Sequence, residues 1–292
     1  MKVFKKNILL IFFISQVFCS EDEKYSFISG GSQRLLIGEK WTFWNTHETS
    51  FTIPKIGFVK YSGRYVDRME AVALEGEFWK FKATLTEMKS DNYVNGIEIM
   101  NYYRDAMENN PCYLYVKNRG FDDDVDHIEP IKEEDAYLQE AYEAAYMNIL
   151  RKPFRYPFGG KAVDVAVGDK WIYDQFSSRI YVNIGSPPSL LTSGERIFTL
   201  KRVKEKGGRK IAIIELQEDE EIEMPLTVDF LGERRLMVGH VTGSVDMTYR
   251  WDMDSGEMLK VRAIANLAGD FEMDGKIFYM KIFMRNISKK VQ

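Results

Sequence analysis

The sequence contains few cysteines and few histidines, and this scarcity limits its chemistry. Cys19 lies near the start of the chain, so Cys112 is the cysteine of its main body. One cysteine cannot form an internal disulfide, so the core must hold the fold, and we expect Cys112 to be buried and inert. The histidines His47, His127 and His240 are far apart, and none belongs to a His-Glu-x-x-His zinc motif.

Other catalytic signatures are also missing from the sequence. It has no Gly-x-Ser-x-Gly nucleophile elbow and no Walker-type phosphate loop, and its paired glycines lack a dinucleotide fingerprint. A hydrolase would need one histidine to meet a carboxylate and a nucleophile in a cleft. With 40 basic and 44 acidic residues the formal charge is −4, which gives no basic excess for nucleic acid. We therefore expect a non-enzyme with no catalytic residues, no cofactor and no nucleic-acid partner.

The start of the chain has the features of a signal peptide, residues 1–19. A basic stretch ends at Lys6, and a short apolar core follows from Ile8 to Ile14. This core is too short to span a bilayer, and no later apolar run is long enough for a membrane anchor. Cleavage after Cys19 predicts export to the periplasm or the medium. The alternative is a lipoprotein that is acylated and anchored at Cys19.

An internal repeat is the most informative feature of the sequence. Gly38-Glu39-Lys40-Trp41 recurs as Gly168-Asp169-Lys170-Trp171. After a slip of one residue, further positions match with preserved spacing: Gly63 with Gly194, Gly76 with Gly207, Leu85 with Leu216, and Glu87 with Glu218. The pattern predicts a duplication, with β repeats at 20–131 and 161–292 and a connecting segment at 132–160.

Within the repeating unit, apolar and polar residues alternate along the chain, as is typical of antiparallel strands. In one strand the apolar residues Trp79, Phe81, Ala83 and Leu85 alternate with Lys80, Lys82, Thr84 and Thr86. A second strand alternates in the same way from Ser244 to Met253, and residues 234–287 are predicted to form a meander of three long strands. Turn sequences such as Lys206-Gly207-Gly208, Asp254-Ser255-Gly256 and Asp274-Gly275 separate the runs.

One segment differs from the β pattern. Residues 133–152 have a helical apolar spacing, acidic residues at the start, basic residues at the end, and Pro153 immediately after. The predicted fold class is therefore all-β and mostly antiparallel. It consists of two related curved sheets or a continuous half-barrel, with one helix between the repeats.

Two motifs carry a resemblance to known proteins. Val167-Gly168-Asp169-Lys170-Trp171 and the strand–turn segment Tyr249-Arg250-Trp251-Asp252-Met253-Asp254-Ser255-Gly256 resemble an uncharacterised family of exported bacterial β-rich proteins. The architecture is similar to lipoprotein carriers of the LolA/LolB type, in which a curved half-barrel holds a lipid or acyl chain. The resemblance covers mainly residues 160–290, and it implies a fold more strongly than a function.

One acidic segment has the spacing of a calcium loop. Asp122, Asp124, Asp126 and Glu133 occupy positions 1, 3, 5 and 12. However, His127 takes the position where the sharp turn needs glycine. A solvated loop is the favoured interpretation, and no metal is expected.

Methionine is concentrated in the last part of the chain, together with aromatic residues. Flexible thioethers adapt to irregular apolar ligands, although the same side chains could simply fill the core. Trp41 and Trp171 are expected to be core anchors, with ligand stacking as the alternative. The candidate ligand-binding residues are Met247, Tyr249, Trp251, Met253, Phe278 and Met280.

These features together predict an exported, non-catalytic binding protein. It would hold an apolar small molecule, a lipid or an acyl chain in the concave face of a curved sheet. The alternative is a structural or protein–protein interaction module of the cell envelope, with another envelope protein as its partner and with contacts in the loops 121–131 and 183–194.

Overall fold

The structure is a computed structural model, and it describes only part of the chain. The described residues are 24–27, 36–53, 57–99, 108–117, 125–130, 163–173, 177–180, 189–230 and 233–291. Every regular element in these ranges is a β-strand, which confirms the all-β, antiparallel prediction. The helix expected at 133–152 is not confirmed, because those residues lie outside the described ranges and the ranges contain no helix. The signal peptide predicted at residues 1–19 also lies outside them.

The strands differ greatly in length, and the longest belong to two consecutive series. The first series follows the short β1 (Tyr25–Phe27) and is β2 (Lys40–Ile53), β3 (Gly57–Glu75), β4 (Phe78–Val94), β5 (Ile97–Ile99), β6 (Pro111–Lys117) and β7 (Val125–Pro130). The second is β8 (Val163–Val165), β9 (Lys170–Tyr173), β10 (Ser177–Ile180), β11 (Ser189–Lys206), β12 (Arg209–Phe230), β13 (Glu233–Asp252), β14 (Glu257–Met273) and β15 (Lys276–Lys290).

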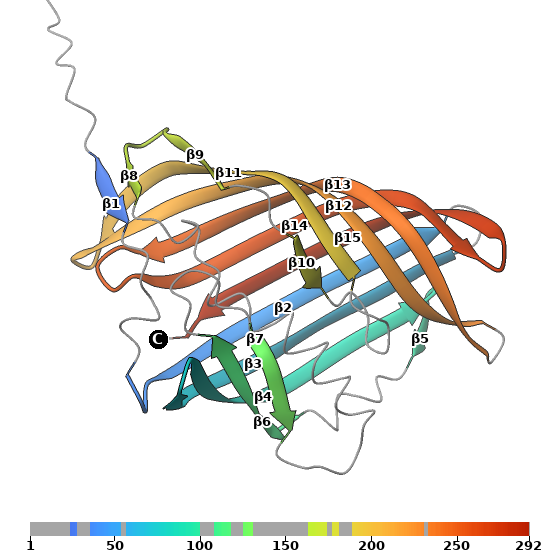
Figure 1. Cartoon of the computed structure of the whole chain (residues 1–292), viewed down its shortest axis with the longest axis horizontal. Helices are drawn as coiled ribbons and strands as arrows, with labels where there is room; N and C mark the ends of the chain where they lie inside the picture. Colours follow the sequence, from blue (N-terminus) through green and yellow to red (C-terminus); the bar gives the residue numbers. More distant parts are fainter. Residues whose placement is uncertain are drawn as a thin grey trace, which may run out of the picture.

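Apart from β8, both series belong to one antiparallel sheet of 13 strands. Its order is β10-β11-β12-β13-β14-β15-β2-β3-β4-β6-β7, with β9 on β11 and β5 on β4, while β1 and β8 pair separately (Figure 1). The expected meander is present as β13, β14 and β15. The two halves meet where β15 pairs with β2, from Lys281↔Thr52 to Lys290↔Phe43.

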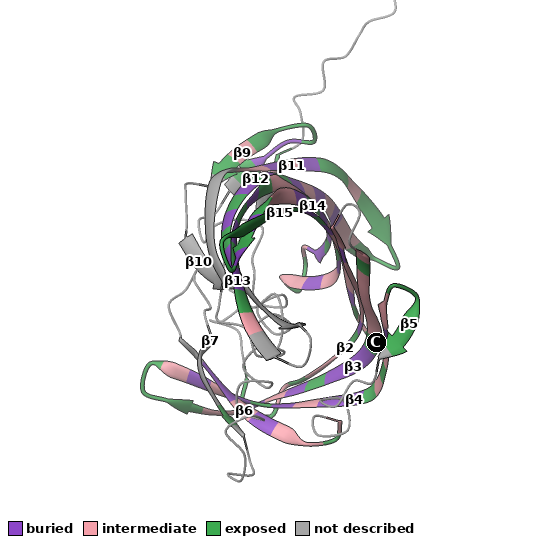
Figure 2. Cartoon of the chain, turned by 90° about the vertical axis from the view of Figure 1, so that its right-hand side faces the viewer, coloured by how far each residue is buried: buried purple, intermediate pink, exposed green. Residues whose placement is uncertain are grey.

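The sheet curls strongly, so that its long strands wrap around a common interior (Figure 2). Along β14, Leu267, Phe271 and Met273 are buried, whereas the alternate residues Asp270 and Glu272 are exposed. Buried side chains from β2 and β11, on well-separated parts of the curl, belong to one hydrophobic cluster, so the buried face is the concave one. Apolar residues thus make up most of the concave face, and most of the charged residues of the long strands lie on the convex face.

The concave face carries two hydrophobic clusters. The Trp251 cluster is built from Phe43, Val165, Phe198, Leu200, Ala212, Ile214, Leu216, Tyr249, Trp251, Met258 and Val261. The Phe271 cluster is built from Phe51, Ile222, Met224, Met237, Val241, Val245, Ala265, Leu267, Phe271, Met273, Met280 and Ile282. Burial of these side chains is the main favourable contribution to the stability of the sheet.

Glycines on the concave face bring β13 and β14 close together. A Cβ on Gly243 would lie 2.0 Å from the carbonyl oxygen of Asn266, and one on Gly269 would lie 1.9 Å from that of His240. The ring of Phe271 lies directly over Gly239. Because no side chains occupy these positions, the two strands can approach and bend toward the interior.

The two Gly-acid-Lys-Trp segments form the same turn. Gly38 N donates to Ala71 O at 2.7 Å, and Gly168 N donates to Leu200 O, also at 2.7 Å. Both glycines have a positive φ, 89° and 98°, and an acidic side chain closes each turn. The duplication itself stays a prediction, but these two segments have one geometry.

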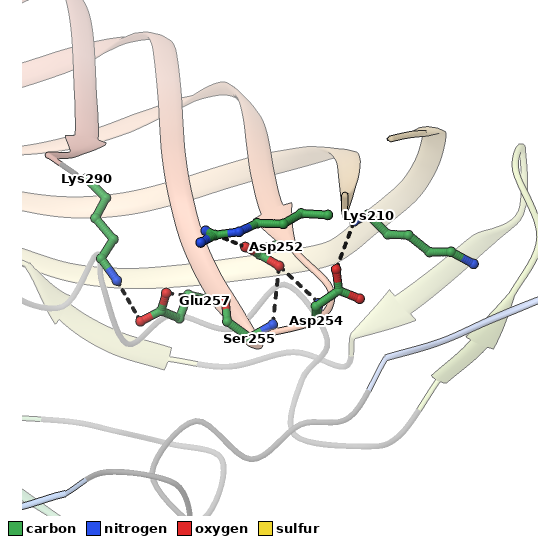
Figure 3. Close-up of polar contacts among 7 residues, drawn as sticks. Lys210, Asp252, Asp254, Ser255, Glu257 and Lys290 are labelled. Atoms are coloured by element: carbon green, nitrogen blue, oxygen red, sulfur yellow. Dashed lines mark hydrogen bonds and ion pairs between the residues drawn. The ribbon is translucent and has the colours of Figure 1, made fainter. Parts of the chain in front are cut away.

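The turn between β13 and β14 is held by a buried carboxylate. Asp252 Oδ1 accepts from the backbone nitrogens of Asp254 and Ser255 at 3.0 and 3.2 Å (Figure 3). Lys210 N in turn donates to Asp254 Oδ2 at 3.0 Å, which joins the turn to β12. Both carboxylates of the Tyr249–Gly256 motif, Asp252 and Asp254, therefore have structural roles in this turn.

Candidate functional site

The residues expected to bind ligand from β13 lie on the concave face. Tyr249 and Trp251 are buried in the Trp251 cluster, and the Tyr249 hydroxyl donates to Met247 Sδ at 3.2 Å. Met253 follows the end of β13 and packs against the same cluster. These residues are part of the core of the sheet.

The other two residues, from β15, lie in the second cluster. Met280 is buried in the Phe271 cluster, and Phe278 packs against it. Met247 packs against both clusters and therefore lies where they meet. The structure thus places all six residues against one concave face but does not gather them at one point.

The repeated tryptophans pack against neighbouring aromatic rings. Trp171 stacks on Phe198 with centroids 5.5 Å apart, and Trp41 meets Phe81 edge-on at 6.0 Å. Both pack against the Trp251 cluster, as expected for core anchors.

The structure does not assemble the calcium loop within the part of the chain that it describes. Asp122, Asp124 and Glu133 lie outside the described residues, and Asp126 belongs to strand β7. No group of three or more potential metal ligands occurs among the described residues. Cys112 is fully buried, as expected for an inert core thiol.

Two groups of polar side chains lie on the concave face, and we call them together the polar belt. One group, on β11 and β12, consists of Arg196, Glu218 and Glu220, and the other, on β15, β2 and β3, consists of Asn286, Ser288, Asn45, His47, Tyr65 and Asp67. Apolar residues of β13 and β14, such as Val245 and Ala265, lie between the two groups. Register pairs join members of the second group, for example Ser288↔Asn45 and Asn45↔Tyr65. A polar belt inside a concave face is unusual, because burying polar groups costs free energy unless each finds a partner.

At one end of the belt is a buried ion pair. Arg196 Nε donates to Glu218 Oε1 at 2.7 Å, and the two side chains are 12% and 0% exposed. The second oxygen, Glu218 Oε2, has no hydrogen-bond partner in the described structure. The pair is therefore charged and buried but only partly satisfied.

At the other end is a buried carboxyl group with no cation beside it. Asp67 is 1% exposed and faces Phe43 on β2 and Leu85 on β4, both buried. Burial raises the pKa of Asp67 from 3.8 to about 8, so the group is mostly neutral at pH 7. Within the described part of the chain its Oδ1 has no hydrogen-bond partner.

Tyr65 and His47 complete this end of the belt. Burial, and secondarily the Asp67 charge, raise the pKa of Tyr65 well above its usual value. The rings of His47 and Tyr65 lie with centroids 6.1 Å apart. A Cβ on Gly63 would lie 2.5 Å from His47 Cε1, so glycine leaves room for the imidazole.

The sequence analysis did not identify the polar belt. Glu218 belongs to an acidic run in β12, which looks like a solvated surface when neighbouring strands are unknown. Asp67 gave a clearer signal, because it alternates with Tyr65, Met69 and Ala71 on the apolar face of β3. A carboxyl group in that phase should be buried.

A second feature is an exposed apolar patch on the convex face, at the end of the sheet where β12 turns into β13 and β14 into β15. It consists of Leu236, Val238, Ile277 and Tyr279, each between 41% and 71% exposed. Val238 and Ile277 lie in one register row with the exposed Glu272 between them. We call this the convex patch.

Comparisons with known proteins do not show a family for this chain. No family model matches it, and no curated protein matches it. A solved structure described as "Asymmetric conductivity of engineered proteins" aligns with 87% of this chain and 100% of its own, at 8% identity and a TM-score of 0.24, too low to support any argument. Among the described residues there is no helix long and apolar enough to cross a membrane.

Proposed function

We propose that this protein is an exported, non-catalytic binding protein that holds an apolar ligand, such as a lipid or an acyl chain, against the concave face of its sheet. The observation that carries the proposal is the division of the long strands into an apolar concave face and a charged convex face. The proposal of export rests on the basic and apolar start of the sequence.

The composition of the concave face supports this proposal. Methionines occur in both clusters: Met258 in the Trp251 cluster, and Met224, Met237, Met273 and Met280 in the Phe271 cluster. Unbranched thioether side chains can change rotamer at low cost and so adapt to a flexible chain. Apolar surface of this kind suits a hydrocarbon ligand.

Intact mass spectrometry of the mature protein tests the proposal. The protein is purified from an envelope fraction without detergent and measured under native and then denaturing conditions. We expect additional mass that departs on denaturation and fragments as lipid. A bare polypeptide under both conditions would contradict the proposal.

Neighbouring residues on β13 provide matched variants for a binding assay. The lipid-free protein is titrated with dansyl-undecanoic acid below its micelle concentration. Met247→Gln should weaken binding, because it places an amide where the two clusters meet. Asp246→Asn, on the exposed convex face, should leave binding unchanged. Equal binding by both variants would place the ligand elsewhere.

The convex patch favours a second candidate function, a structural or protein–protein interaction module of the cell envelope. Exposed apolar patches on folded proteins commonly mark interaction surfaces. Ile277→Lys should then reduce co-purification with an envelope partner without changing the unfolding midpoint. A bare polypeptide in mass spectrometry together with this loss would favour the second function.

A further inference from the structure

Asp67 is a buried carboxyl group among apolar side chains, and its Oδ1 has no hydrogen-bond partner in the described part of the chain. This setting indicates which kind of ligand headgroup could bind there. The neighbours of Asp67 on the concave face are Phe43 and Leu85 across the strands and Met69 along β3, all at most 3% exposed. A carboxyl group in such a setting lowers the stability of the fold whenever it is charged. An asparagine or a leucine would fill similar space without that cost.

The cations that the structure pairs on the same face have other partners. Arg196 binds Glu218 at 2.7 Å, and Lys290, which shares a register row with Phe43, binds Glu257 at 2.6 Å. The polar belt therefore contains a compensated carboxylate at Glu218 and an uncompensated carboxyl at Asp67. In its ionised form, the uncompensated group needs a hydrogen-bond donor that carries positive charge.

We propose that the ligand of the concave face is an amphipathic amine, and that Asp67 binds its ammonium group while the hydrocarbon chain lies against the neighbouring apolar clusters. This inference rests on the proposed function, because it names the class of ligand for the same face. The ammonium donates to Asp67 Oδ1, and Tyr65 lies beside the carboxylate on the same strand.

The position of Asp67 between apolar side chains and the polar belt supports this geometry. Phe43, its register partner on β2, belongs to the Trp251 cluster, and Tyr65, two residues along β3, belongs to the polar belt. An amphipathic molecule has a matching apolar chain and polar headgroup. The position of the headgroup beside Asp67 would fix the orientation of the molecule on this face. A carboxylate headgroup would instead place a second negative charge beside the ionised Asp67, and an alcohol would leave the ionised carboxyl without a compensating cation.

A set of three probes with the same chain tests the inference: dodecylamine and laurate below their micelle concentrations and 1-dodecanol below its solubility limit, each titrated by calorimetry. We expect dodecylamine to bind about tenfold or more tightly than the other two, since a charged hydrogen bond replaces a neutral or repulsive contact. Asp67→Asn should abolish this preference and retain a weaker, unselective binding. Asp246→Asn, the same change on the convex face, should keep it.

The pH dependence gives an independent readout. The titratable groups on the surrounding concave face are Tyr65 on the same strand and Lys290, which lies beyond Phe43 in the same register row and is paired with Glu257. His47 on β2 lies beside Tyr65, and β4 contributes Leu85. An ammonium binds the ionised carboxyl, so dodecylamine affinity should rise about tenfold per pH unit between pH 6 and 8 and then level off. This slope should vanish in Asp67→Asn, and circular dichroism would confirm that the variant is folded.

The outcomes separate the inference from the function on which it rests. Equal binding of all three probes, unaffected by Asp67→Asn, would overturn the amine inference and retain apolar-ligand binding. No binding of any probe would overturn both. Stronger binding of laurate would also overturn the inference, since it would assign a cationic group to the headgroup site.

Discussion

Two buried carboxyl groups of the polar belt differ in their partners. Glu218 is paired with Arg196 at 2.7 Å, which is the arrangement that permits a buried charge. Asp67 has no such partner among the described residues, and burial raises its pKa to about 8. Glu218 thus has a cation beside it, whereas Asp67 is mostly neutral at pH 7.

The pKa of Asp67 makes the stability of the fold depend on pH. Because the folded pKa is raised, the unfolded chain releases this proton first, so folding loses stability as pH rises from about 4 to about 8. The slope is at most about 1.4 kcal/mol per pH unit. Asp67→Asn should remove this part of the slope, measured by urea unfolding at pH 5, 6, 7 and 8. Parallel stability profiles for the variant and the wild type would contradict the assignment.

The ion pair predicts an asymmetric response to substitution. Arg196→Met leaves the Glu218 carboxylate buried without its cation and should cost about 3–5 kcal/mol of unfolding free energy. The double variant Arg196→Met, Glu218→Met should recover most of that loss, because both charges are gone. Denaturant unfolding of the wild type, the single variants Arg196→Met and Glu218→Met, and the double variant measures this coupling. Additive losses would show that the two side chains do not interact.

At the scale of the element, the concave glycines decide how closely β13 and β14 approach. Gly243→Ala places a methyl group 2.0 Å from the Asn266 carbonyl oxygen, in backbone that cannot move without breaking the ladder. We expect a loss of about 1–3 kcal/mol in urea unfolding. Thr242→Ala, at the exposed neighbouring position, should change stability by about 0.5 kcal/mol or less. A neutral Gly243→Ala would show that the sheet can open at this point.

The strands themselves were largely predictable, and the sheet they form was less so. The alternation from Trp79 to Leu85 and the turn at Asp274-Gly275 are local signals, and the structure follows them. The pairing of β15 with β2 joins residues more than two hundred positions apart, and no local pattern encodes it. The polar belt depends on that pairing, because Asn286 and His47 become neighbours only through it.

At the scale of the whole molecule, the pairing of β15 with β2 determines whether the two halves form one sheet. It is the ladder that holds the strands from β10 to β15 and those from β2 to β7 in one sheet. Without it, β15 and β2 would each present a long open edge. The halves are therefore expected to fold as a unit.

Removal of residues 276–292 tests this dependence. The truncated chain should lose the cooperative thermal transition seen by circular dichroism and should aggregate through the exposed edges. Lys289→Ala, an exposed position on the convex side of β15, serves as a control that should unfold like the wild type. A sharp transition in the truncated chain would show that the halves fold independently.

The junction also imposes an order in time. The ribosome makes β2 early, but the strand that covers its outer edge appears only when residues 276–290 have been synthesised. Until then the ladder between the halves cannot form, and contacts of such long sequence separation form slowly even afterwards. The nascent chain therefore cannot complete its sheet during most of its synthesis. Translocation channels also require their substrates to be unfolded. A chaperone that binds the nascent chain would have to cover the open edge of β2.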